Sequence, residues 1–244
     1  MDADETDPRQ AAIRELFEEV GVLLARGPVQ ETELARGDTL RKRVLGGESF
    51  RGVLAERGLR PDVGALRYFA HWITPSAEPK RFSARFFVAT LPAGQTVNTS
   101  ASGPDQEPDQ EPDQGPDQMP GEMDDACWIR PTEALARAAT LRLPPPQLRI
   151  LRDLRELAGR GGIANVLMAC AERATAPHPI LPRIAPHGDG VALLLPWDPD
   201  YHALGTGEAL AIRADHPLAE GPSRFILEDA TWKHVDAPRS ASVG

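Results

Sequence analysis

The sequence predicts an α/β protein in which a mixed sheet lies between helices. Three observations support this class: an amphipathic segment over 9–20, strand-like segments over 66–74 and 84–91, and helical periodicity again after residue 131. Helical and strand-like segments that alternate along the chain are typical of mixed α/β folds, because each helix or strand buries one of its sides. A chain of 244 residues can bury one substantial core, or one domain with an appendage.

The first helix, predicted over 9–20, carries the most informative pattern. Glu15, Glu18 and Glu19 stand at i, i+3 and i+4, so their carboxylates share one face. The opposite face is apolar and comprises Ile13, Leu16, Phe17 and Val20. Adjacent carboxylates repel one another unless a cation lies among them, and oxygen ligands suit Mg²⁺. The spacing indicates part of a metal site that would bind a diphosphate. For glutamates at this spacing, however, a solvated helix face is the more common interpretation.

The segment after this helix predicts a turn and further short elements. Gly21 suits the end of the helix, because glycine readily adopts the left-handed conformation found there. A short buried strand is predicted at 22–24. The Arg/Glu-rich segment 28–58 predicts two short helices that separate at Gly46-Gly47.

Residues 104–119 form four tandem tetrapeptides, each beginning Pro-Asp-Gln. Periodic proline with aspartate and glutamine excludes helix and sheet and offers nothing to bury, so this segment is expected to be disordered. A calcium-binding repeat is the alternative, but the units lack regular turn-forming glycines. Because the entropy of loop closure rises only with the logarithm of loop length, such an insert between strands should leave the fold intact.

The C-terminal part predicts helices and then a β-rich texture. Helices are expected over 131–139, 147–158 and 163–174. Strands are expected over 191–195, 210–213 and 224–227, in a segment punctuated by proline and glycine. We therefore expect two domains, 1–160 and a helical and β-rich C-terminal extension over 161–244.

Net charge, cysteines and histidines indicate which kinds of function the chain favours and which it does not. A net charge of −9 argues against nucleic-acid binding and agrees with metal-dependent chemistry, in which the ion supplies positive charge. Cys127 and Cys170 lack metal-ligand spacing and are expected to be reduced packing residues. The scattered histidines His178, His187, His202 and His216 match no zinc pattern, so surface positions are favoured over a zinc site. With no apolar membrane span and no signal peptide evident, a cytoplasmic location is expected.

Several motifs together resemble the Nudix hydrolase family. Arg14, Glu15, Leu16, Glu18, Glu19, Gly21 and Val22 match the second half of the Nudix box. The branch that it resembles includes peroxisomal coenzyme A diphosphatase-like proteins and bacterial relatives, some with a small C-terminal β appendage. The residues that resemble this branch are Ala70–Pro75, Arg81-Phe82, Arg85–Ala89, Trp128 and Pro131–Leu135. The likeness covers roughly residues 9 to 155.

The resemblance implies a Nudix-type α/β/α sandwich and hydrolysis of a diphosphate linkage. Mg²⁺ or Mn²⁺ would be held by Glu15, Glu18 and Glu19, and Glu18 is also an implied catalytic residue. Arg14 would point away from the metal and pair with a glutamate earlier in the box. Glu122, six residues before Trp128, would complete the metal site or act as the general base; an exposed loop carboxylate is the alternative.

The implied partner is a small-molecule nucleoside diphosphate derivative, with no nucleic acid and no membrane involved. The branch favours coenzyme A or acyl-coenzyme A, whereas no residue selects that substrate over a nucleotide sugar or a dinucleotide. Phe69, Trp72 and Arg81 are candidates for substrate contact, although aromatic residues in strands more often belong to the core. The sequence specifies no oligomeric state, but unpaired sheet edges would favour association.

The first half of the box is missing. Its glycine position falls before Met1, and its glutamate position falls on Thr6, one place from Glu5. On one interpretation, Glu5 and Asp7 belong to an insertion within the box. The opening strands are therefore expected to be absent, either because the start codon is assigned too late or the gene is truncated, or because the protein is a catalytically degenerate Nudix-like binding or interaction module.

Overall fold

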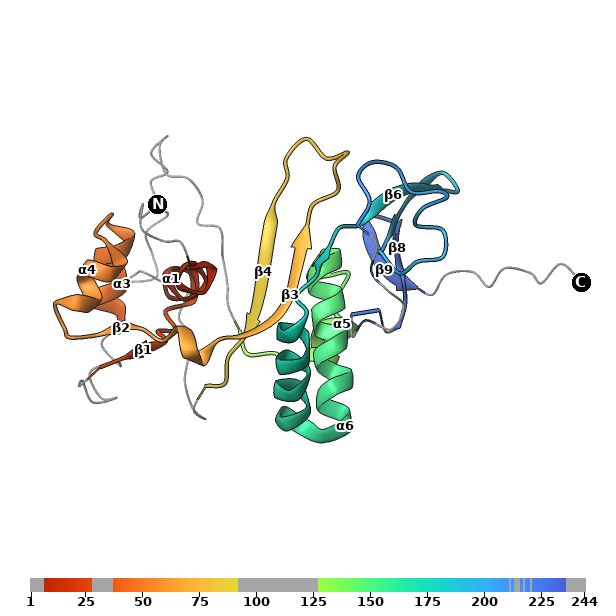
Figure 1. Ribbon diagram of the computed structural model, residues 1–244. Coiled ribbons are helices and arrows are strands. Elements are labelled where there is room, and N and C mark those ends of the chain that lie inside the picture. Colours follow the sequence, from red (N-terminus) through yellow and green to blue (C-terminus); the bar gives the residue numbers. More distant parts are fainter. Residues whose placement is uncertain are drawn as a thin grey trace, which may run out of the picture. The chain divides into compact units, whose positions relative to one another are not determined.

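The computed structural model describes residues 7–27, 37–91, 127–210, 212, 216, 218–219 and 221–235. It divides into two compact units (Figure 1). Unit 1 comprises Met1–Leu66 and Ala89–Trp128, and unit 2 comprises Arg67–Val88 and Ile129–Gly244. The repeat at 104–119 and Glu122 lie outside the described residues.

Unit 1 is mainly helical in its described part. Its helices are α1 (Pro8–Val20), α3 (Gly37–Leu45), α4 (Phe50–Ala55) and the short 3₁₀ helix η1 (Val63–Ala65). Its two short strands, β1 (Ala25–Arg26) and β2 (Arg60–Pro61), pair antiparallel. The predicted helix over 9–20 is confirmed, as is the separation of two helices at Gly46-Gly47.

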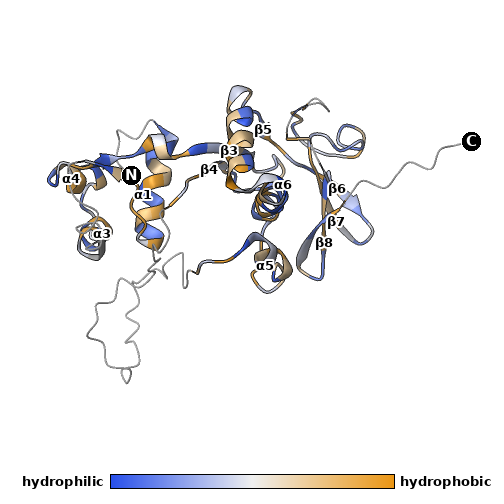
Figure 2. Cartoon of the chain, turned by 90° about the horizontal axis from the view of Figure 1, so that it is seen from below, coloured by the Kyte–Doolittle hydropathy of each residue, from blue (hydrophilic) through white to orange (hydrophobic). Residues whose placement is uncertain are grey.

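Local signals at both ends explain where α1 begins and ends. The Asp7 side chain accepts a hydrogen bond from the Arg9 amide at 2.9 Å, and Pro8 occupies the first turn, where no donor is needed. Gly21 adopts φ 71°, the predicted left-handed cap. Figure 2 shows hydrophobic and hydrophilic residues alternating along this helix. Its hydrophobic side chains Ile13 and Phe17 are fully buried.

The strand predicted at 22–24 is wrong. Val22 and Leu24 are buried, as their apolar character required, but strand pairing starts only at Ala25. Instead, the Leu24 carbonyl accepts a hydrogen bond from the Asp62 amide at 2.9 Å. An apolar run of three residues indicates burial, whereas a strand requires a partner backbone in register.

Unit 2 contains the predicted mixed sheet. Its strands are β3 (Arg67–Ile73), β4 (Ser83–Val88) and β5 (Pro179–Ile180), in the order β4-β3-β5. β3 pairs antiparallel with β4 and parallel with β5. Among the described residues, α6 is the helix that packs on β3. The α/β/α sandwich as a whole stays a prediction.

The helices of unit 2 are α5 (Pro131–Ala136) and α6 (Pro145–Thr175), and α6 is broken in the middle. Gly161 and Gly162 have non-helical backbone angles, and the chain reverses there so that the two halves of α6 run side by side (Figure 1). The helices predicted over 147–158 and 163–174 correspond to these two halves. The expected domain boundary at residue 160 therefore falls at the turn of a helical hairpin inside unit 2.

The C-terminal β region forms a four-stranded antiparallel sheet. Its strands are β6 (Arg183–His187), β7 (Gly190–Leu194), β8 (Arg224–Glu228) and β9 (Thr231–Val235), paired in that order. The strands predicted at 191–195 and 224–227 are confirmed. The strand predicted at 210–213 is not: Leu210 and Ile212 have no strand structure, and the other two residues lie outside the described residues.

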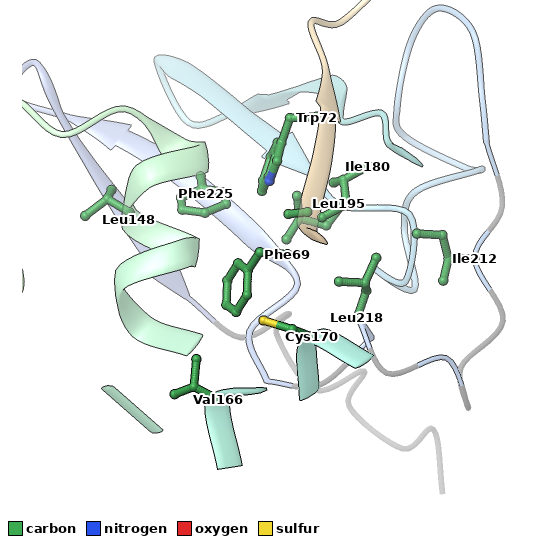
Figure 3. Close-up of a cluster of buried hydrophobic side chains, with 11 residues drawn as sticks. Phe69, Trp72, Leu148, Val166, Cys170, Ile180, Leu195, Ile212, Leu218 and Phe225 are labelled. Atoms are coloured by element: carbon green, nitrogen blue, oxygen red, sulfur yellow. The ribbon is translucent and has the colours of Figure 1, made fainter. Parts of the chain in front are cut away.

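This region is not a separate appendage, because it shares a core with β3 and α6 (Figure 3). Trp72 of β3 meets Phe225 of β8 edge to face, with ring centroids 6.4 Å apart. Cys170 and Val166, from the second half of α6, lie in the same cluster. The C-terminal strands thus contribute directly to the burial of the β3 face that carries Phe69 and Trp72.

A buried charge cluster ties these segments together. The Asp153 carboxylate forms ion pairs with Arg149 (Nε to Oδ1, 2.7 Å) and with Arg173 (Nη2 to Oδ2, 2.7 Å). One carboxylate thus binds one arginine from each half of α6. Arg149 also donates to the Leu218 carbonyl at 3.1 Å, and Arg173 donates to the Phe69 carbonyl at 3.3 Å. Buried charges need such partners, because desolvation otherwise costs several kcal/mol.

Candidate functional site

The three candidate metal ligands lie on the last two turns of α1 in unit 1. The Glu15 side chain is 59% exposed and the Glu18 side chain 25% exposed, whereas Ile13 and Phe17 on the opposite side are buried. Phe17 packs against Phe50 of α4, with ring centroids 5.8 Å apart. The apolar face therefore fixes which way the glutamates point.

Arg14 lies among the carboxylates. Its Nη1 atom is 2.6 Å from Glu18 Oε2, and its Nη2 atom is 3.6 Å from Glu15 Oε1. The resemblance implied that Arg14 points away from the metal ligands towards an earlier glutamate. In this structure it pairs with two of the proposed ligands themselves: with Glu18, at the i,i+4 spacing that brings side chains together on a helix, and with its neighbour Glu15.

Arg41 of α3, which sequence reasoning missed, holds the end of α1. Its side chain is 4% exposed; its Nε atom donates to the Glu18 carbonyl at 2.9 Å, and its Nη2 atom donates to the Glu19 carbonyl at 2.8 Å. The last carbonyls of any helix lack intrahelical donors, so a partner was to be expected. The sequence offers several arginines between 37 and 60 and no local signal that selects this one.

The donor types fit Mg²⁺ or Mn²⁺, but the carboxylates do not converge as the structure stands. In the part of the chain that the structure describes, no three His, Cys, Asp or Glu side chains form a group that could hold a metal ion. Glu18 instead accepts a hydrogen bond from Arg14. A divalent ion at Glu15, Glu18 and Glu19 would therefore have to share Glu18 with Arg14 or displace Arg14 from it.

The candidate substrate-contact residues lie in unit 2. Phe69 and Trp72 are 1% and 5% exposed and belong to the core, which agrees with the usual place of aromatic residues in strands. Arg81 is exposed near the tip of the β3–β4 hairpin. It donates to the Thr74 carbonyl at 3.2 Å and lies 3.4 Å from Glu208.

The thiols and histidines show no sign of a second metal site among the described residues. Both cysteines are free; Cys170 is buried, as expected of a packing residue, whereas Cys127 is exposed, so that expectation is wrong for Cys127. His216 and His178 are in edge-to-face contact, with ring centroids 5.9 Å apart. Both nitrogens of His216 have main-chain partners, the Ala176 carbonyl and the Leu218 amide, so neither presents a lone pair to zinc.

No family model matches the sequence, and no solved structure matches it. The chain is similar to the acyl-coenzyme A diphosphatase NUDT19 of Homo sapiens, with 30% identity over 210 residues that cover 79% of this chain and 50% of the human protein. The chain thus spans about half the length of this relative. The similarity supports a relationship to the Nudix family.

This relationship supports the general class of hydrolase for the chain, without specifying a reaction or a substrate. Among the described helices, none combines the length and the apolar character that a membrane crossing requires. The cytoplasmic location stays a prediction.

Proposed function

We propose that the chain is a metal-dependent hydrolase that cleaves a diphosphate linkage in a nucleoside diphosphate derivative, with coenzyme A or acyl-coenzyme A as the substrate. The observation that carries this proposal is the capped helix α1, which presents Glu15, Glu18 and Glu19 within two turns. The human relative is an acyl-coenzyme A diphosphatase, which supports the choice of substrate.

Glu15, Glu18 and Glu19 are the proposed ligands of Mg²⁺ or Mn²⁺. When bound, the ion would offset the charge of the diphosphate and polarise its phosphoryl oxygens. Arg14 contacts Glu15 and Glu18, and its proposed role is to orient them. Glu122 remains the proposed general base, on the resemblance of the sequence alone.

Charge gives an independent reason for a cation at this place. The chain carries a net charge of −9, and a diphosphate is itself an anion, so the overall field opposes substrate binding. A cation on α1 would reverse the sign of the local potential. Without one, three carboxylates within two turns would repel the substrate.

A Nudix-like module without turnover is the second candidate. The observation that favours it is the Arg14–Glu18 ion pair, at 2.6 Å, which occupies a proposed ligand. In that case Arg14 serves as the permanent counter-ion of the helix face. The protein would then bind a ligand or a partner without hydrolysing it.

Substitution of Glu18 separates the two candidates. We expect Mg²⁺-dependent release of 3′,5′-ADP from coenzyme A by the full chain, and a loss of several orders of magnitude in Glu18→Gln, because the amide is a weaker metal ligand than a carboxylate. Mn²⁺ binding, followed by electron paramagnetic resonance, should weaken in parallel.

Glu78→Gln is the matched control, since Glu78 is exposed on the β3–β4 hairpin and the substitution removes the same charge. We expect it to retain the activity and the Mn²⁺ affinity of the unsubstituted chain. Equal rates for Glu18→Gln and Glu78→Gln would remove Glu18 from the chemistry. A chain that neither binds Mn²⁺ nor releases product would support the module instead.

A further inference from the structure

Among the described residues, donors are found for three of the last four carbonyls of α1. The Phe17 carbonyl accepts from the Gly21 amide at 3.0 Å, which is the ordinary closing bond of the helix. The next two carbonyls, of Glu18 and Glu19, accept from Arg41. A side chain from another helix thus completes the end of α1 at the two residues that carry proposed ligands.

The guanidinium group is suited to this task. Its donors form a rigid planar fork, so two of them can bind two successive carbonyls at 2.9 and 2.8 Å in one orientation. A lysine offers a single nitrogen atom. Arg41 is also buried, at 4% exposure, so water does not compete for its donors. The hydrogen bonds are therefore stronger and the guanidinium group is fixed in place.

Arg41 is itself held firmly by its helix. Its neighbour Leu40 and Val44, one turn further on, are both buried in α3, and α3 packs against α1. Movement of the α1 terminus would therefore disturb a packed helix pair. The terminus is held by packing and by hydrogen bonds, whereas a solvent-exposed helix end is free to fray.

We infer that Arg41 is a positioning residue for the metal site: it fixes the backbone of Glu18 and Glu19, and through it the directions in which their carboxylates leave the helix. This inference rests on the proposed function. Groups that orient metal ligands without touching the metal typically contribute about 10–100-fold to affinity or activity.

The test compares Arg41→Met, Arg41→Lys and the control Val53→Ala. Val53 is buried in α4 of the same unit, so its truncation destabilises unit 1 while the Arg41 side chain and its two acceptor carbonyls stay unaltered. All variants are measured well below their unfolding midpoints. We expect Arg41→Met to weaken Mn²⁺ binding and lower kcat by about 10–100-fold each. Arg41→Lys should be intermediate, and Val53→Ala should bind Mn²⁺ as the unsubstituted chain does.

Mn²⁺ affinity is the decisive reading, because a purely structural role would not change it in a folded variant. If both Arg41 variants bind Mn²⁺ and turn over coenzyme A like Val53→Ala, Arg41 is only a helix cap and the inference is overturned. Should Arg41→Met fail to fold, Arg41→Lys alone decides the matter in the same way. An unsubstituted chain without Mn²⁺ binding or turnover overturns the proposed function, and the inference with it, which is a distinguishable result.

Discussion

At the scale of single residues, His234 of β9 has a pKa far below the ordinary value of a histidine. Its ring stacks on Phe225 at 4.1 Å with nearly parallel planes, and its Nε2 atom lies 2.9 Å from the Pro222 carbonyl. Because a carbonyl only accepts, the Nε2 atom of His234 carries a proton and donates this hydrogen bond. Burial lowers the pKa of His234 to about 3, and the positive charges of Arg149 and Arg152 add to this effect.

Stability should therefore fall in mild acid on account of His234. The unfolded chain takes up a proton near pH 6.5 and the folded chain only near pH 3, so the stabilisation is complete above pH 6.5 and is lost as the pH falls through this window. Between pH 7 and pH 5 the expected loss is about 2 kcal/mol.

Urea unfolding of the full chain and of His234→Gln at both pH values measures this effect. Glutamine retains an N–H donor but does not titrate. We expect the decrease in the free energy of unfolding between pH 7 and pH 5 to be about 2 kcal/mol smaller in the variant. Identical decreases in both proteins would show that folding does not lower the pKa of His234.

At the scale of elements, the break in α6 depends on one glycine. Gly162 has φ 63° and ψ −154°, a region that side chains with a Cβ atom essentially do not adopt. A Cβ atom there would meet nothing within 4 Å, so conformation and not crowding makes glycine necessary. Without this reversal, the arginines of the two halves would not meet at Asp153.

Two alanine substitutions of opposite sign test this account. Gly162→Ala should destabilise unit 2 by about 1–3 kcal/mol, because it forces a Cβ atom into a strained region. Gly159→Ala adds the same methyl group three residues earlier, also with no atom within 4 Å. It should stabilise the helix by about 0.5–1 kcal/mol. Thermal or urea unfolding measures both, and equal effects would contradict the role assigned to Gly162.

At the scale of the whole molecule, long-range partners unite segments that are far apart in the sequence. The carboxylate of Asp153 connects the two halves of α6, and its two arginines reach onward to β3 and to the segment before β8. Unit 2 should therefore unfold cooperatively, with this cluster among its most sensitive points.

We expect Asp153→Asn to cost about 3–5 kcal/mol, because Arg149 and Arg173 then share a buried site without their common counter-ion. Glu156→Gln is the matched control. It breaks the more exposed Arg152–Glu156 pair, at 2.9 Å, one turn further along the same helix. That change should cost less than about 1 kcal/mol. Similar unfolding midpoints for the two variants would show that the buried cluster contributes little.

The sequence by itself determined what depends on near neighbours in the chain. Periodicity located α1, the helices on either side of Gly46-Gly47, and strands β3 and β4, and Gly21 marked the end of α1. The common face of Glu15, Glu18 and Glu19 follows from the same local geometry. Each of these features involves residues a few positions apart, so local sterics and hydrogen bonding suffice to specify it.

Only the tertiary structure decided which distant groups meet. It paired β5 with β3, merged the C-terminal sheet into the core of unit 2, and brought Arg41 to the carbonyls at the end of α1. Many arginines and many apolar segments are chemically equivalent candidates for such contacts. Selection among them depends on the simultaneous packing of all elements, and no local pattern in a single sequence carries that information.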